Sequence, residues 1–123
     1  MIEPVMIVLY VDNIETSSPF YQKLLGLKPV EASETFHQFT LSNGMSIGLK
    51  TRHSVSPPSN SHSNDNNELA FVVNDREKVD VFFSNSKELG IQTSHKPALE
   101  SYGYTFVGLD PDGNRLRFAS LNV

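Results

Sequence analysis

The side chains of this sequence best suited to ligand chemistry are aromatic rings and an arginine near the C-terminus. Aromatic faces stack on planar molecules and add stabilisation beyond simple burial. The aromatic candidates are Tyr10, Tyr102, Tyr104 and Phe106. Arg117 carries a planar guanidinium that binds carboxylates through paired hydrogen bonds. The same residue types also suit a hydrophobic core or an internal ion pair, and at this point both interpretations stay open.

The histidines are weaker candidates for chemistry. His37 lies in an apolar, strand-like segment, where a histidine is more often a hydrogen-bonded wall residue than a catalytic base. His53 and His62 lie in a polar segment without a recognisable third metal ligand. No pattern supplies the partners of a catalytic triad, and we predict no catalytic residue.

The composition restricts the classes of function. The chain of 123 residues has no cysteine, which excludes disulfides, thiolate nucleophiles and zinc–cysteine sites. The net charge of -4 provides no basic field, so neither nucleic acid nor a membrane is expected as a partner. The apolar run at residues 5–11 is too short for a signal or membrane segment, which indicates a cytoplasmic location. A chain of this length is expected to form a single domain that gains from dimerisation.

The first half of the chain predicts one strand, one helix and three further strands. Residues 5–11 are apolar and β-branched, Asn13 suits a helix cap, and Gly26 suits a helix end. Three strands follow, over residues 27–32, 35–41 and 45–51. The Asn43-Gly44 pair predicts a tight hairpin in which both residues take a positive φ.

The second half repeats this order of elements. Residues 68–73 predict a strand, and residues 74–77 resemble a capping box that opens a helix. The core-facing stripe of that helix consists of Val79, Phe82, Phe83, Ser86 and Leu89. Strands follow over residues 91–97, 104–109 and 115–121. The repeat predicts an α+β fold of two β-α-β-β-β modules, module one over residues 1–51 and module two over residues 68–123.

The modules are joined by residues 52–67, which are rich in Ser, Asn and Pro. This segment has too little apolar content to pack in a core. We interpret it as an exposed linker, with a lid over a pocket as the alternative.

Two motifs and the duplicated order of elements resemble one known family. Residues 13–27 contain a Phe-Tyr pair and a Leu-Leu-Gly-Leu ending, like the family's first helix, and Asp-Pro-Asp-Gly-Asn at residues 110–114 is similar to its final turn. The family is the vicinal oxygen chelate superfamily of glyoxalases, bleomycin-resistance proteins and dioxygenases. The resemblance covers nearly the whole chain. It implies a mixed sheet that curls around a cleft, with the helices outside.

Enzymes of this family bind a metal ion through the first and last strands of each module. Carried over by motif, the ligand positions fall on Met6, Gly48, Glu68 and Arg117. A divalent ion about 4 Å from Arg117 would meet a repulsion of roughly 8 kcal/mol at an effective dielectric constant of about 20. The pattern is therefore similar to the antibiotic-binding branch, such as the phenazine-resistance proteins, which bind flat aromatic molecules. It implies no metal and no other cofactor.

Strand alternation predicts which side chains face the cleft. Met6, Val8 and Tyr10 share one face of the first strand, and the aliphatic residues of the other face are expected to contact the helix. Glu68 and Arg117 likewise fall on cleft faces, and we predict that they form an ion pair, because an unpaired charge there would be costly. The alternative is that Arg117 stays free for a ligand carboxylate. Arg115, close to the turn, is expected to be a solvated surface charge.

These expectations combine into one predicted site. Its ligand-binding residues are Met6, Val8, Tyr10, His37, Glu68, Tyr102, Tyr104, Phe106 and Arg117. They predict a metal-free homodimer that sequesters an aromatic compound or antibiotic. The alternative is a metal-dependent lyase or isomerase of the same superfamily that uses Glu68, His37 and a linker histidine. A family member with an interaction role alone is a third possibility.

Overall fold

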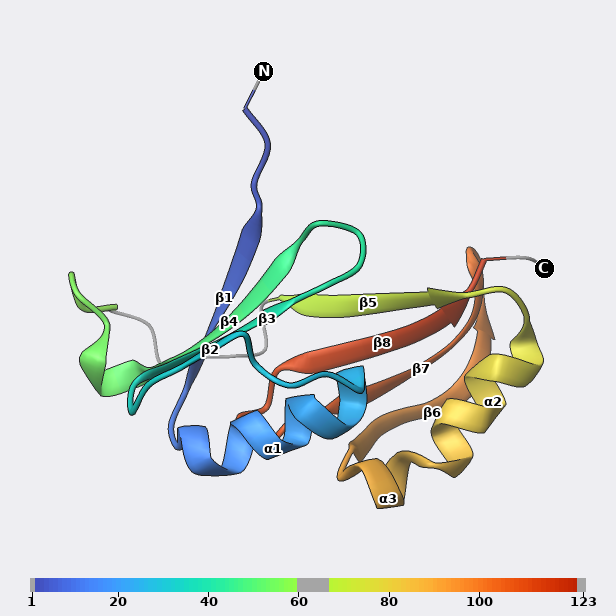
Figure 1. Ribbon diagram of the computed structural model, residues 1–123. Coiled ribbons are helices and arrows are strands. Elements are labelled where there is room, and N and C mark those ends of the chain that lie inside the picture. The colour runs from blue at the N-terminus through green and yellow to red at the C-terminus, as the bar shows by residue number, and fades with distance from the viewer. Residues whose placement is uncertain (1, 60–66, 122–123) are drawn as a thin grey trace. The chain divides into compact units, whose positions relative to one another are not determined.

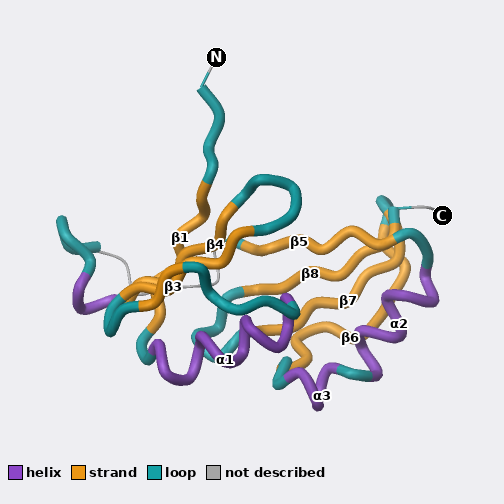
Figure 2. Tube along the Cα trace, viewed as in Figure 1, coloured by secondary structure: helices purple, strands orange, loops and turns teal. Residues whose placement is uncertain are grey.

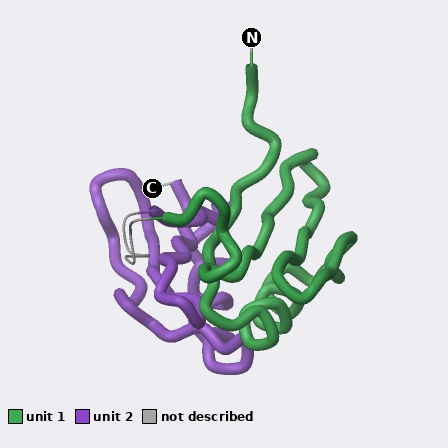
Figure 3. The backbone as a smooth tube through the Cα atoms, turned by 90° about the vertical axis from the view of Figure 1, so that its left-hand side faces the viewer, with its two compact units in different colours: residues 1–62 green, residues 63–123 purple. Residues whose placement is uncertain are grey.

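The computed structural model describes residues 2–59 and 67–121, which fold into two compact units (Figures 1 and 3). Unit one is residues 1–62 and unit two is residues 63–123. Each contains one of the predicted β-α-β-β-β modules, with short helices and a four-stranded mixed sheet (Figure 2). The predicted α+β class is confirmed. The single-domain organisation and the shared cleft stay predictions.

Unit one is a sheet in the order β1-β4-β3-β2, with a helix on one face. Its elements are β1 (Met6–Val11), α1 (Ile14–Leu25), β2 (Glu31–Ala32), β3 (Phe36–Thr40), β4 (Ser46–Thr51) and the short 3-10 helix η1 (Arg52–Ser54). Strand β1 is parallel to β4, and the other neighbours are antiparallel. The largest fully buried side chains of this unit are Tyr21, Phe39, Leu49 and Val11.

The ends of α1 follow from its sequence. The Asn13 side chain accepts a hydrogen bond from the Glu15 amide, and Gly26 closes the helix in the left-handed conformation with φ of 66°. The strand predicted at residues 27–32 is shorter, because only residues 31–32 join the ladder. Pro29 precedes this segment and has no N–H to donate to a neighbouring strand.

Unit two is a sheet in the order β5-β8-β7-β6, with helices on one face. Its elements are β5 (Glu68–Val73), α2 (Arg76–Ser84), α3 (Ser86–Leu89), β6 (Gln92–Glu100), β7 (Gly103–Leu109) and β8 (Arg115–Ser120). Strand β5 is parallel to β8, and the remaining pairs are antiparallel. The predicted helix is split at Asn85, and its cap is Asp75, whose carboxylate accepts from the Lys78 amide.

Stacked phenylalanines form the core between α2 and the sheet of unit two. The Phe118 ring lies 4.8 Å from the Phe106 ring and 4.8 Å from the Phe82 ring, measured between centroids. Phe83 meets Phe106 edge to face, and Phe71 stacks on Phe118. Because side chains alternate along a strand, these contacts assign even-numbered residues of β7 and β8 to the helix side. Odd-numbered residues lie on the opposite face.

Two turns refine the predictions made from their sequences. Gly44 has a positive φ of 92°, but Asn43 does not, and its side chain instead accepts from the Met45 amide. The prediction of positive φ at both residues was therefore wrong. In the turn before β8, the Asp110 carboxylate accepts from the amides of Asp112 and Asn114. No helix among the described residues is long and apolar enough to cross a membrane.

Candidate functional site

The face of the unit two sheet opposite α2 carries a polar cluster, which we call the arginine site: Glu68, Tyr102, Thr105, Arg115 and Arg117. Three strands and one turn contribute to it. Glu68 begins β5, Thr105 lies on β7, and both arginines lie on β8. Arg117 pairs in register with Ala70 on one side and Val107 on the other. Arg117 therefore lies on a central strand of the sheet, and Glu68 lies on the neighbouring edge strand β5.

Arg117 and Glu68 form the ion pair predicted from the sequence. Arg117 Nε donates to Glu68 Oε2, and Nη2 donates to Oε1 at 3.3 Å. Arg117 Nη1 donates to the Tyr102 hydroxyl and to Thr105 Oγ1, the latter at 3.4 Å. The guanidinium is thus held in one orientation by three side chains. The two charged side chains stay partly solvated, with 21% of Arg117 and 32% of Glu68 exposed.

The ion pair also changes the acidity of its members. The hydrogen bond from Arg117 lowers the pKa of Glu68 below its usual 4.5, and desolvation only partly opposes that change. The same hydrogen bond raises the pKa of Arg117. Both groups therefore stay charged at neutral pH.

Tyr102 places an aromatic ring beside Arg117. The Arg117 guanidinium carbon lies 5.6 Å from the ring centroid, within the range of a cation–π contact, and 44% of Tyr102 is exposed. The turn that carries Tyr102 depends on Gly103, whose φ is 154°. A Cβ atom on Gly103 would lie 2.1 Å from the Ser120 carbonyl oxygen, so only glycine lets this turn approach β8 so closely.

Arg115 differs from its expected role as a solvated surface charge. Its side chain is 32% exposed, and its Nε lies 4.0 Å from Glu68 Oε1. That Nε is buried and has no hydrogen-bond partner among the residues that the structure describes. The spacing of Arg115 and Arg117 is the sequence signal for this position, because residues two apart on a strand share a face.

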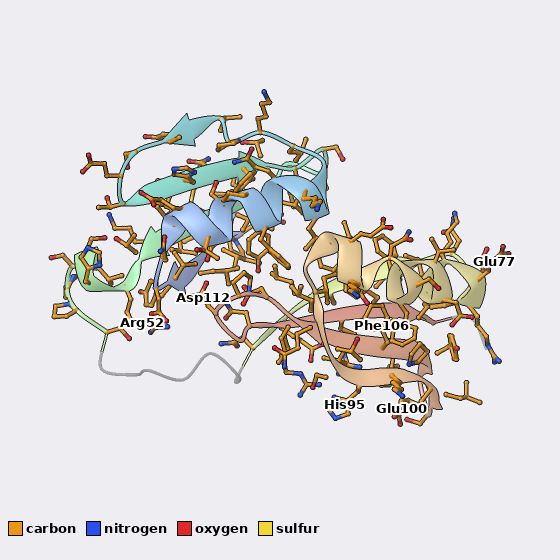
Figure 4. All side chains as sticks on the ribbon, turned by 90° about the horizontal axis from the view of Figure 1, so that it is seen from below. Arg52, Glu77, His95, Glu100, Phe106 and Asp112 are labelled. Carbon is orange, nitrogen blue, oxygen red and sulfur yellow. The ribbon has the colours of Figure 1, made fainter. Side chains whose placement is uncertain are left out.

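The arginine site opens into a cavity of about 600 Å³ within unit two. Residues from β6 also line it, among them His95, Lys96 and Glu100. His95 and Glu100 project from β6, the edge strand of this sheet (Figure 4). The register of β6 shifts on both sides of His95, and this irregular edge supplies polar side chains to the cavity.

Two of the predicted site residues lie on the other face of unit two. The Tyr104 hydroxyl donates to Asp80 Oδ1 of α2 at 2.7 Å, which raises the pKa of Tyr104. The Arg76 guanidinium lies 5.7 Å from the Tyr104 ring centroid. Phe106 is fully buried in the aromatic core. The structure therefore does not bring Tyr104 and Phe106 together with Tyr102 and Arg117.

In unit one, Met6, Val8 and Tyr10 share the sheet face opposite α1, as strand alternation predicted. The register pairs Val8 with Gly48, and a Cβ atom on Gly48 would lie 3.3 Å from the Met6 sulfur. It would also meet the Phe36 ring at 2.8 Å. Met6 and Gly48, the two ligand positions that the family resemblance implies in this unit, thus lie side by side. Met6 offers only a thioether, and Gly48 has no side chain.

His37 lies on the helix side of unit one. Its Nδ1 is hydrogen-bonded to Ser18 Oγ of α1 at 2.6 Å, and Gln22 donates to the same oxygen at 3.2 Å. Ser18 is 1% exposed, so its hydroxyl is not accessible as a nucleophile. His37 borders a separate cavity of about 800 Å³ between α1 and the strands β2 and β3. His37 is thus a hydrogen-bonded wall residue, but it lies on the opposite face of the sheet from Met6, Val8 and Tyr10, with which it was grouped in the predicted site.

The residues at the family's metal positions do not fit a metal ion. Glu68 is the one carboxylate among them, and both of its oxygens accept hydrogen bonds from Arg117. A divalent cation would have to displace that guanidinium and then stay beside its charge. Among the described residues, no cluster of three or more His, Asp or Glu side chains is arranged to hold a metal. His53 lies in η1, and His62 lies outside the described residues.

Comparison with known proteins agrees with the fold and defines the family. The sequence model of the Glyoxalase/Bleomycin resistance protein/Dioxygenase superfamily matches residues 4–118. The chain belongs to this superfamily.

Several solved structures are similar to this chain. Protein ATC0852 from Agrobacterium tumefaciens, solved by NMR in solution, is 42% identical over 100% of both chains, with a TM-score of 0.90. A glyoxalase-related enzyme from Fulvimarina pelagi is 18% identical over 98% of this chain and 88% of its own, with a TM-score of 0.86. Lactoylglutathione lyase from Agrobacterium tumefaciens is 18% identical over 96% and 92%, with a TM-score of 0.76. The last two show the fold alone, and no curated protein matches the sequence.

Proposed function

We propose that this protein binds and sequesters a small aromatic molecule in the cavity of unit two, without a metal ion and without chemical conversion of the ligand. An aromatic antibiotic is one molecule of this class. The observation that carries the proposal is the contact of Arg117 with both oxygens of Glu68 at positions where the family resemblance implies metal ligands. A guanidinium at that place provides charge and hydrogen bonds but no Lewis acid.

The partly exposed ring of Tyr102 supports an aromatic ligand. It lines a cavity of about 600 Å³, the size of many small-molecule sites. One side of the ring faces the Arg117 guanidinium. Stacking on the remaining surface would bury apolar area on both partners.

The binding experiment compares two tyrosines of the same unit. Protein purified without chelators is tested by elemental analysis and then titrated with a panel of planar fluorescent dyes, anionic and neutral. We expect Tyr102→Leu to weaken binding by about fivefold, the loss of about 1 kcal/mol of stacking. Tyr104→Leu is the matched control, because Tyr104 contacts Asp80 on the opposite face. Its dye affinity should stay within about twofold of the unchanged protein.

Three results would contradict the proposal. They are the absence of dye binding, equal weakening by the two tyrosine substitutions, and one tightly held metal ion per chain whose removal lowers the melting temperature. The last result would favour the alternative, a metal-dependent lyase or isomerase of the superfamily.

A further inference from the structure

We infer that the cavity of unit two is built for an aromatic anion, whose acid group is bound by Arg115 rather than by Arg117. This inference rests on the proposed function and names the chemical class of its ligand.

The charges around the cavity do not balance. Arg115, Arg117 and Lys96 line it, whereas the carboxylates there are those of Glu68 and Glu100. Glu68 accepts two hydrogen bonds from Arg117, so its negative charge largely neutralises the charge of that arginine. The cavity is left with an excess of positive charge, which favours a negatively charged ligand.

Arg117 has little hydrogen-bonding capacity left for a ligand. Its Nε and Nη2 bond to Glu68, and both Nη1 bonds go to Tyr102 and Thr105. A ligand acid that took over these donors would have to displace Glu68 and leave a carboxylate without its partner, which is unfavourable in a partly buried site.

Arg115, unlike Arg117, keeps hydrogen-bond donors that no described side chain occupies. Its Nε is buried and has no hydrogen-bond partner in the described part of the chain, and Glu68 Oε1 at 4.0 Å is too distant to accept. The Arg115 side chain nevertheless lines the cavity and is 32% exposed, so an anion can bind the accessible part of its guanidinium without displacing an existing hydrogen bond. The guanidinium also presents a planar fork suited to a carboxylate or sulfonate.

The positions of the two arginines on β8 also set the shape of the ligand. Arg115 and Arg117 are two residues apart on one face, a separation of roughly 7 Å along the strand. Tyr102 contacts Arg117. A planar molecule that places its acid group at Arg115 and extends across Arg117 therefore reaches the Tyr102 ring, and a fused bicyclic ring system has this length.

The test uses two dyes that share one ring skeleton. 8-Anilinonaphthalene-1-sulfonate carries an acid group, and N-phenyl-1-naphthylamine lacks it. We expect the unchanged protein to bind the sulfonate about tenfold more tightly than the neutral dye. Arg115→Gln should remove about tenfold of sulfonate affinity and leave neutral-dye affinity unchanged, whereas Arg115→Lys should retain part of the preference.

Arg76→Gln is the matched control, since it removes the same charge from the same unit on the helix side of the sheet. It should change the affinity of neither dye by more than about twofold. Binding of both dyes with equal affinity would overturn the anion inference and leave the proposed function standing. Equal loss of sulfonate binding in the Arg76 and Arg115 variants would overturn the role of Arg115. Absence of binding by either dye would overturn the inference and the proposed function together.

Discussion

Arg117 and Glu68 are joined by two hydrogen bonds, but the ion pair is only partly buried. About a fifth of the arginine side chain and a third of the glutamate side chain remain exposed. Water therefore screens the charges, and the pair should stabilise the fold less than a fully buried pair, whose disruption costs several kcal/mol. The planar fork and the additional bonds to Tyr102 and Thr105 raise its contribution above that of an isolated surface pair.

A double-mutant cycle measures this contribution. We expect Glu68→Gln and Arg117→Met to be destabilising singly and to show a coupling energy of about 1 kcal/mol, so that the double variant loses less stability than the sum. The measurement is denaturant unfolding of the four proteins at neutral pH. Single effects that add within about 0.3 kcal/mol would contradict a stabilising pair.

The pH dependence of the same cycle provides an independent check. Arg117 lowers the pKa of Glu68 in the folded protein, so the unfolded chain binds a proton more readily. The contribution of the pair is therefore fully present above the usual pKa of 4.5 and is lost as the pH falls through the lower folded value. The coupling energy should be constant near neutrality and decrease below pH 4.5. An increase on acidification would contradict the assigned partner.

Among the site residues, Glu68 and Arg117 could be predicted because two signals, the family motif and strand alternation, applied to each of them. Arg115 was misjudged because its closeness to a turn received more weight than its shared face with Arg117. Tyr104 and Phe106 were grouped with Tyr102 because their residue types suit a core and a ligand site equally well. Which face of β7 contacts α2 decides between a core position and a ligand site. That choice depends on tertiary contacts, which the sequence alone does not give.

At the scale of elements, the turn between β6 and β7 positions Tyr102. Glu100 pairs with Gly103 across this hairpin, and Gly103 lies against the backbone of Ser120 on β8. The place of the tyrosine ring therefore depends on a close approach of two backbones.

Gly103→Ala should destabilise the protein strongly. The new Cβ would meet a backbone oxygen at 2.1 Å in a φ region that favours glycine, and we expect a loss of more than about 2 kcal/mol, with weaker dye binding. Gly44→Ala is the control: its φ is also positive, at 92°, but no atom lies within 4 Å of the added Cβ. That change should cost about 1 kcal/mol. Thermal and denaturant unfolding compare the two, and equal losses would show that the contact with β8 is unimportant.

The main elements were predictable because hydrophobic periodicity and end signals agreed with each other, as at Asn13 and Gly26. The observed element bounds differ from the predicted ones where contacts with other strands and helices determine the structure. Strand β6 continues through Pro97 because it is an edge strand, where a missing N–H costs no ladder bond on its open side. The helix of unit two breaks at Asn85, although its core-facing stripe continues to Ser86, which is buried.

At the scale of the molecule, each unit ends in an open edge strand within its own sheet. Strand β1 is hydrogen-bonded to β4 alone, and β5 to β8 alone. Both strands carry exposed apolar side chains, with 44% of Val8 and 62% of Val72 accessible. Apolar edge strands favour pairing with further strands, whether these come from the same chain or from a second copy.

We therefore predict a homodimer in which apolar edges of this kind are covered by the second copy. Sedimentation at micromolar concentration should give a mass of about 27 kDa, twice the 13.7 kDa of one chain. Val72→Lys places a charge on the β5 edge and should shift the protein toward monomer by at least about tenfold in the dissociation constant. Val81→Lys is the matched control, because Val81 is 50% exposed on α2, away from the sheet edge. A monomer at micromolar concentration would contradict the dimer, whereas a dimer equally stable in both variants would place its interface elsewhere than at β5.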